Sequence, residues 1–207
     1  MSKRTRFVTG LSFSLAIFGG AAAYAQERGG QPPEMSAEEK AKMEAWEKAK
    51  AVGEQHKLLA DYMAGQWEFT NRMWMEPGAD PMESKGTCTS RMILGGRFIE
   101  TSHKGDFMGE PFEGIGITGY DNMKKKYIGT WVDNMGTCII SVEGSYDAGS
   151  KTFTYTCSFD CPFEQSPVKV REVIRLVDKN KHVLEWYETR AGKENKTMEI
   201  TYTRKGA

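Results

Sequence analysis

The side chains that could do chemistry are few and lie far apart in the sequence. His56, His103 and His182 are the only histidines, and no two of them have the spacing of metal ligands. Histidines that pack in the fold or lie on its surface are the simplest interpretation, so no metal site is predicted. The chain also has no GxSxG motif to present a serine nucleophile. Catalytic residues are therefore not identified.

A disulfide is possible between two of the four cysteines. Cys138 and Cys157 fall in neighbouring predicted strands, and the alternation of side chains puts both on one face. A hairpin in which Tyr146 pairs with Lys151 would bring them within about one pairing step of each other. Cys161 continues the same face, so either cysteine is a candidate partner for Cys138. Unpaired thiols that pack as small apolar residues are an equal alternative.

Glycines beside aromatic residues are the clearest hint of a binding site. Gly114, Gly116, Gly129 and Gly144 are expected in inward rows that also hold aromatic rings. Such an interior can be packed solid or can hold a small apolar ligand, and both remain open. The candidate ligand-binding side chains are Trp131, Tyr120, Arg97 and Tyr187.

Carboxylates near predicted turns support an alternative function. Asp121, Asp133 and Glu113 could form a site for an enzyme or an accessory factor at the mouth of a barrel. Solvated charges are the default for such positions, and no nucleophile with a base accompanies them. Whether the protein is an enzyme is left open, and a non-catalytic carrier of a small apolar molecule is the preferred interpretation.

Ten β-strands would position these residues. From residue 66 onwards β-branched and aromatic residues alternate with polar ones, and turn residues recur about every ten positions. Because the connections are short, consecutive strands must be antiparallel neighbours, and closure removes the exposed edges. The sequence predicts an all-β domain over 65–207, a closed up-and-down antiparallel barrel of about ten strands. We expect strands near 66–75, 85–94, 97–103, 112–120, 126–133, 137–145, 151–158, 168–177, 182–189 and 195–204.

A helical segment is predicted over 36–64, ahead of the barrel. Ser36 and Glu39 form a capping-box pattern before a run rich in Ala, Glu and Lys. Gly53 is expected to break this helix, and a second helical stretch then continues to Gly65 as a plug or lid. Residues 26–35, which are polar with Gly and Pro, predict a disordered linker.

The first 25 residues predict export. Lys3, Arg4 and Arg6 precede an uncharged run that ends in Ala-Tyr-Ala at 23–25, the pattern that signal peptidase cleaves. The apolar core of this run is shorter than the ~20 residues of a spanning helix. We expect cleavage near Ala25 and a periplasmic or secreted protein with no integral membrane segment.

Cleavage also changes the net charge. The whole chain has 28 basic and 28 acidic residues, and residues 1–25 hold three basic and no acidic ones. The mature chain is left with 25 basic against 28 acidic residues, a net charge of about −3. Nucleic acid is therefore not expected as a partner, because phosphate binding needs a basic surface.

Short motifs of glycine, aromatic and charged residues follow one another in a characteristic order. They are HKLL at 56–59, GQW at 65–67, LGGRF at 94–98, GEPFEG at 109–114, GYD at 119–121, WVD at 131–133 and KENKTMEITYTR at 193–204. In this order they resemble the bacterial family called domain of unknown function 1579. The resemblance implies a closed, lipocalin-like barrel and no settled biochemical role.

Two residues also look like the wider calycin signature, in which a tryptophan of the first strand packs under an arginine of the last. Here they are Trp67 and Arg204, and a guanidinium over an indole ring is a favourable cation–π pair. No cofactor is predicted. Haem is an alternative, because some ten-stranded barrels hold it through one buried histidine, for which His103 or His182 would serve. However, the glycine-rich N-terminal motif of the haem-binding nitrobindin barrels is missing at 65–69.

Overall fold

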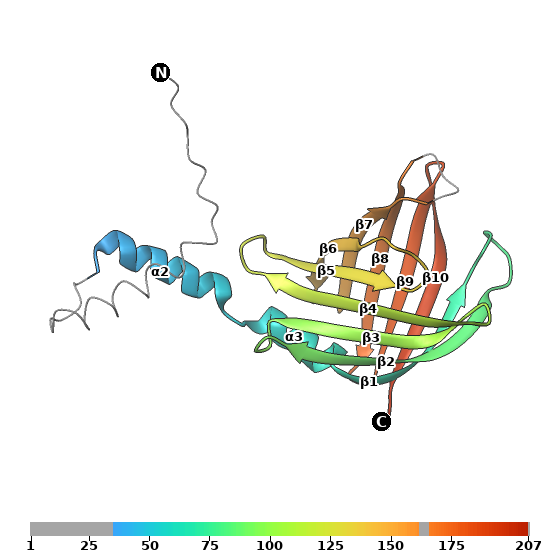
Figure 1. The fold of residues 1–207 in the computed structure, drawn as a ribbon, viewed down its shortest axis with the longest axis horizontal. Coiled ribbons are helices and arrows are strands. Elements are labelled where there is room, and N and C mark those ends of the chain that lie inside the picture. The colour runs from blue at the N-terminus through green and yellow to red at the C-terminus, as the bar shows by residue number, and fades with distance from the viewer. Residues whose placement is uncertain (1–34, 162–165, 207) are drawn as a thin grey trace, which may run out of the picture. The chain divides into compact units, whose positions relative to one another are not determined.

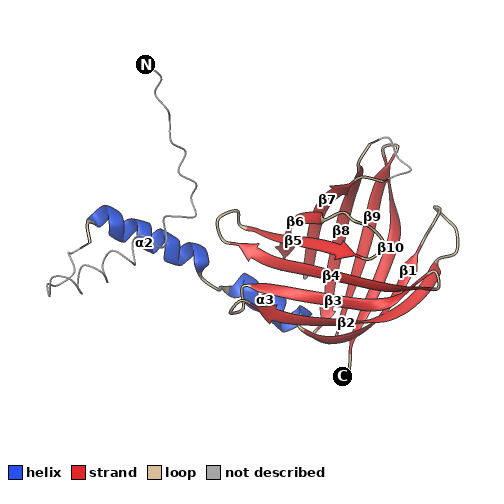
Figure 2. Cartoon of the chain, viewed as in Figure 1, coloured by secondary structure: helices blue, strands red, loops and turns tan. Residues whose placement is uncertain are grey.

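The computed structural model describes residues 35–161 and 166–206. The predicted signal peptide and all but the last residue of the predicted linker lie outside these ranges. The chain divides into two units, residues 1–47 and 48–207. Figure 2 distinguishes the helical residues of the chain from its strands.

The helix α2 (Ala37–Lys50) begins at the predicted capping box. The Ser36 hydroxyl accepts a hydrogen bond from the Glu39 amide at 3.2 Å, and the Glu39 carboxylate accepts one from the Ser36 amide at 2.8 Å. Glu38 and Lys42, one turn apart, form an ion pair at 2.6 Å. None of the residues of α2 is buried, so local interactions and not a core define this helix.

The helix α3 (Glu54–Met63) belongs to the same unit as the barrel and closes one of its ends. The Gly53 amide donates to Nδ1 of His56 at 3.1 Å, so this histidine caps the start of the helix. Leu59 is only 2% exposed and packs in the core formed by inward residues of several strands, and Leu58 and Met63 pack beside it. The predicted plug is therefore present.

Ten strands form the closed antiparallel up-and-down barrel that the sequence predicts, and β1 pairs with β10 to complete it (Figure 1). The strands are β1 (Gly65–Met73), β2 (Met82–Ile93), β3 (Phe98–Phe107), β4 (Glu110–Asp121), β5 (Lys126–Asp133), β6 (Ile140–Asp147), β7 (Thr152–Phe159), β8 (Val168–Asp178), β9 (Lys181–Arg190) and β10 (Lys193–Arg204).

The two ends of the barrel differ. Strand β1 starts directly after α3, so every odd-numbered strand starts at the end that α3 closes and every even-numbered strand finishes there. The connections at 74–81, 108–109, 134–139 and 191–192 lie at the other end, which we call the mouth. A site inside the barrel is thus reached from the mouth.

The hairpin of β6 and β7 differs from its prediction. Strand β6 begins at Ile140, three residues after the predicted start, and Asp147 pairs with Thr152. The turn has the four residues expected but begins one residue later, at Ala148, where the Asp147 carboxylate accepts hydrogen bonds from the amides of Gly149 and Ser150. The predicted register is therefore wrong by two residues. The pairing of β6 with β7 stops at Glu143 and Thr156, so the two strands separate towards the mouth.

Trp67 and Arg204 hold the first and last strands together. They are direct register partners, and the guanidinium lies 4.2 Å from the centroid of the indole ring. Arg204 also donates to the carbonyls of Ala64 at 2.7 Å and Lys179 at 2.9 Å. The Trp67 indole N–H donates to the Met63 carbonyl at 3.0 Å, and its side chain is 1% exposed. The seam of the barrel is thus also tied to the end of α3.

Replacement of Trp67 by Ala is expected to lower the free energy of unfolding by about 3–5 kcal/mol, because it removes a fully buried ring and the partner of Arg204. Urea denaturation followed by circular dichroism measures this loss. Trp46→Ala is the matched control, since Trp46 is 53% exposed and should tolerate the same change. Equal effects of the two substitutions would contradict the role of Trp67 in the seam.

Candidate ligand-binding cavity

The interior of the barrel contains a cavity of about 410 Å³. Leu59 and Met63 of α3 form part of its lining at the closed end, and Phe107 and Met135 form part of it near the mouth. Most of the surface between them is apolar, with side chains such as Ile174 and Leu184. A volume of this size is in the range of small-molecule sites in proteins.

Aromatic rings occupy the space that inward glycines leave free. The Trp131 ring lies against both Gly114 and Gly116, so closely that a Cβ atom on either residue would be crowded by it. Tyr155 covers Gly144 in the same way. The predicted small positions walled by rings are therefore present, and the rings fill part of the space without closing the cavity.

A cluster of uncharged polar groups interrupts the apolar lining. The Cys88 thiol and the Ser90 hydroxyl lie 3.4 Å apart, within hydrogen-bond distance for sulfur. Nε2 of His103 lies 3.0 Å from the Tyr202 hydroxyl. His182 stacks on the Tyr202 ring with 4.5 Å between centroids. The cluster comes from β2 and β3 on one side of β1 and from β10 and β9 on its other side.

Burial keeps this cluster uncharged. Desolvation lowers the pKa of His103 to about 4 and, with help from the positive charge of Arg204, that of His182 to about 3. Burial also raises the pKa of the Cys88 thiol to about 11. Both imidazoles have a buried Nδ1 with no hydrogen-bond partner in the described chain. A ligand that supplied a polar atom here would satisfy groups that the fold leaves unsatisfied.

Glu172 is the one glutamate among the residues lining the cavity. It lies midway along β8, opposite Tyr155 of β7 and Trp186 of β9. No hydrogen bond or ion pair joins its carboxyl group to any residue for which coordinates are described. Desolvation raises its pKa to about 7, because an ionised carboxylate is unfavourable in an apolar, counter-ion-free environment.

Only one of the four candidate ligand-binding residues lines this cavity. Trp131 does so, whereas Tyr120 packs on Tyr127 next to α3, with ring centroids 5.0 Å apart. Arg97 lies in the turn after β2 and donates to the carbonyls of Leu94 and Lys50. Tyr187 lies on the outside of β9, where the Arg171 guanidinium covers its ring at 4.1 Å.

The alternative acidic site is not assembled. Asp121 ends β4 at the α3 end and accepts hydrogen bonds from the amides of the following turn. Asp133 ends β5 at the mouth, where its carboxylate accepts a hydrogen bond from the Trp131 indole at 2.8 Å. Glu113 is exposed and forms an ion pair with Lys104. The expectation that these three carboxylates meet is therefore wrong, because Asp121 lies at the opposite end of the barrel, and of the two at the mouth only Asp133 lines the cavity.

All four cysteines are free thiols in the structure. Cys138 is exposed and precedes β6, while Cys157 is half-buried on β7. Continuing the observed register would place Cys157 opposite Val142, and Cys138 opposite Cys161, but the strands are no longer paired there. The register that the Cys138–Cys157 hypothesis assumed is thus not formed.

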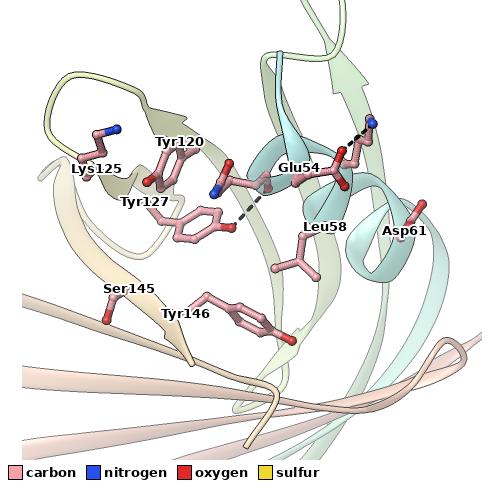
Figure 3. Close-up of a pocket in the computed structure, with 10 residues that line it drawn as sticks. Glu54, Leu58, Asp61, Tyr120, Lys125, Tyr127, Ser145 and Tyr146 are labelled. Carbon is pink, nitrogen blue, oxygen red and sulfur yellow. Dashed lines mark hydrogen bonds and ion pairs between the residues drawn. The ribbon is translucent and has the colours of Figure 1, made fainter. Parts of the chain in front are cut away.

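A second hollow, of about 440 Å³, lies outside the barrel between α3 and the ends of β4, β5 and β6 (Figure 3). Figure 3 shows the Tyr127 hydroxyl bound to the carbonyl of Gln55, with Tyr146 and Leu58 beside it. Charged side chains such as Glu54, which pairs with Lys57, border this hollow. It is an open groove with polar and apolar groups in similar share, and the more enclosed, mostly apolar interior cavity is the better candidate for a ligand site.

Two further observations concern the described residues alone. No three of their His, Cys, Asp and Glu side chains come together as a metal site. Among their helices, none has the length and apolar character needed to cross a membrane.

Sequence reasoning missed Glu172 and the uncharged polar cluster. Glu172 is visible in the alternation of β8, because Val168, Val170, Ile174 and Leu176 share its inward row and only it is charged. The meeting of His103 with Tyr202 carries no comparable signal, because they are 99 positions apart and depend on closure of the barrel.

The comparisons agree with this architecture. Residues 51–204 match a family model described as "Protein of unknown function (DUF1579)". Rv2717c from M. tuberculosis has a similar fold, with a TM-score of 0.54 and 11% sequence identity over 75% of this chain and 99% of that one. The S-type phycobiliprotein lyase CPES from Guillardia theta is also similar, with a TM-score of 0.53 and 14% identity over 79% and 98% of the two chains. No curated protein matches the sequence.

Glu172→Gln should make stability less dependent on pH. The carboxyl has a higher pKa when folded, about 7, than the ordinary value of 4.5, so the wild-type protein loses stability as pH rises from about 4.5 to about 7. The difference in the free energy of unfolding between the variant and the wild type should therefore shift in favour of the variant by up to about 3 kcal/mol between pH 4 and pH 8. Urea denaturation at both pH values measures it.

Glu143→Gln is the control for this prediction. Glu143 is an exposed glutamate on β6 that forms an ion pair with Lys126, which lowers its pKa. Its replacement should give no gain at pH 8. An equal gain for the two variants, or none for Glu172→Gln, would argue against a desolvated carboxyl inside the barrel.

Proposed function

The chain belongs to the DUF1579 family of proteins of unknown function, and from that premise we propose that it is a non-catalytic carrier that binds one small, largely apolar molecule inside its barrel. The observation that carries the proposal is the interior cavity of about 410 Å³. An apolar chamber with a few polar groups is the usual form of a small-molecule site. The likeness to other barrels supports the fold alone.

Features of the mouth support a carrier. Met75, Met108 and Met135 are each more than half exposed, in three separate connections at this end of the barrel. Methionine side chains are flexible and polarisable, so they adapt to apolar surfaces of different shapes. An entrance of this kind suits the transfer of an apolar molecule between the cavity and its source.

The cavity is poorly suited to nucleophilic catalysis. The Cys88 thiol stays protonated because its pKa is about 11, and it shares a hydrogen bond with the Ser90 hydroxyl and not with an imidazole. His103 bonds to Tyr202, whose own pKa is raised well above 10 by burial. A nucleophile with an adjacent base is thus missing from the described cavity lining. One of the similar barrels is named a phycobiliprotein lyase, but no catalytic group here follows from that name.

Haem, the alternative considered from the sequence, is less well supported than an uncharged or cationic ligand. Nε2 of His103 is occupied by the Tyr202 hydroxyl. The charged groups that line the cavity are the carboxylates Asp106, Asp133 and Glu172, and Lys and Arg are missing from the described lining. Haem propionates would therefore meet like charges where they need cations.

We also propose that the carrier works outside the cytoplasm, on the basis of the signal-peptide pattern at 1–25. Such a location would fit a protein that moves apolar molecules through water between membranes or cells. N-terminal sequencing of the full-length product, expressed in a Gram-negative host and recovered from the periplasm or medium, should give Gln26 as the first residue. Retention in the cytoplasm with Met1 intact would contradict export.

Binding in the cavity can be tested with Nile red, an uncharged dye whose emission shifts to the blue in apolar surroundings. One dye should bind per chain, and Ile140→Trp should weaken binding by about fivefold or more, about 1 kcal/mol, because it places a larger side chain in the lining. Ile139→Trp is the matched control, because the neighbouring Ile139 is 70% exposed. Failure of the dye to bind, or equal loss in both variants, would count against an interior site.

A further inference from the structure

Glu172 singles out a chemical class of ligand. The cavity lining holds three acidic side chains and, in the portion of the chain with described coordinates, no lysine or arginine to balance them. We infer that the barrel binds a molecule with an apolar body and a protonated amine, and that the amine forms an ion pair with the Glu172 carboxylate. This inference rests on the proposed function, because it requires an interior ligand.

The position of Glu172 is the first step of the argument. Its neighbours on the same inward row are Val170 and Ile174, and its register partners on the adjacent strands are Tyr155 and Trp186. Both rings can contact the apolar body of a ligand whose amine reaches the carboxylate. An aromatic face beside an acid also suits an ammonium group, because the ring attracts cations.

The lack of a counter-ion for the Glu172 carboxylate among the described residues is the second step of the argument. Two other glutamates of the barrel show the contrast: Glu185 on the outside of β9 pairs with Arg175 at 3.1 Å, and Glu194 pairs with Arg171 at 2.7 Å. Glu172 has no such partner among the described residues. A half-buried carboxylate without a cation is costly to keep in a fold, and a ligand cation would supply the missing charge.

The charges around the Glu172 carboxyl group disfavour an anionic ligand. Asp106 and Asp133 add negative charge at the mouth, and His103 and His182 are uncharged because their pKa values are about 4 and about 3. A carboxylate ligand such as a fatty acid would therefore meet repulsion both on entry and at Glu172. The cavity should prefer a cationic amphiphile to an alcohol, and an alcohol to an acid.

The test uses three probes with the same apolar chain: dodecylamine, dodecanol and dodecanoic acid, each kept below the concentration at which it aggregates or separates from water. Displacement of Nile red from the purified protein at pH 8 gives their relative affinities. The amine should displace the dye at about tenfold lower concentration than the alcohol, and the acid should be weakest, because a charge-assisted pair forms only with the amine. An amine no better than the alcohol would overturn the inference.

Glu172→Gln tests the residue itself. In this variant the amine and the alcohol should differ by less than about threefold, because the ion pair that distinguishes them is lost. The control Glu143→Gln removes an exposed carboxylate on β6 and should keep the full preference for the amine. A preference that survives Glu172→Gln would place the amine elsewhere and overturn the assignment.

A pH series on the wild-type protein does not depend on any variant. Dodecylamine stays protonated from pH 5 to pH 8, while Glu172, with a pKa of about 7, loses its charge towards pH 5. The groups that face Glu172 are Tyr155 and Cys157 on β7, Trp186 on β9 and Tyr202 on β10, and none of them titrates in this range. The preference for the amine over the alcohol should therefore be lost at pH 5 and recovered at pH 8.

The outcomes separate the two proposals. Binding of Nile red and of all three probes with similar affinity would retain the carrier and overturn the amine. Failure of the dye and of every probe to bind would overturn the carrier, and the amine with it. The acidic residues at the mouth, Asp106 and Asp133, are distinguished from Glu172 by the variant, because a preference for the amine caused by them would persist in Glu172→Gln.

Discussion

The contact of Arg204 with Trp67 is the interaction on which the rest of the structure depends. It joins the last strand to the first, and closure of the sheet both removes exposed edges and creates an interior. The same two residues bind the carbonyls of Met63 and Ala64, so the helix that closes one end of the barrel is fixed to the seam. The same two residues therefore close the wall of the cavity and hold the helix that forms its floor.

The interior that results combines an apolar lining with polar groups that the protein alone does not satisfy. Among the residues that the structure describes, the buried Nδ1 atoms of His103 and His182 have no hydrogen-bond partner, and Glu172 faces the cavity with no cation beside it. Such groups are rare in a solid core, because each unsatisfied polar group lowers the stability of the folded state. Their presence on several strands around one cavity is unusual for a packed core and is consistent with the proposed binding site.

Strand positions were predictable because alternation and short turns are local, so all ten strands appear close to their expected ranges. The β6–β7 register was not, because hydrogen bonds to the Asp147 side chain accompany a turn that begins one residue later along the chain. Of the site, Trp131 was found through its glycine neighbours, and Glu172 could have been found as the charge in an apolar row. Tyr187 was misplaced although its alternation with Trp186 puts it outside. The pairing of His103 with Tyr202 needs the closed barrel.

The separation of β6 from β7 near the mouth has a mechanical consequence. Strand β6 is paired at only five positions on each side, and residues 140–142 are held by β5 alone. A wider entrance at this point would therefore break no ladder hydrogen bond between β6 and β7. Amide hydrogen exchange should thus be faster at these positions than in the middle of β8 or β9. The rate of ligand exchange would then be set by side-chain packing and not by unfolding of the barrel.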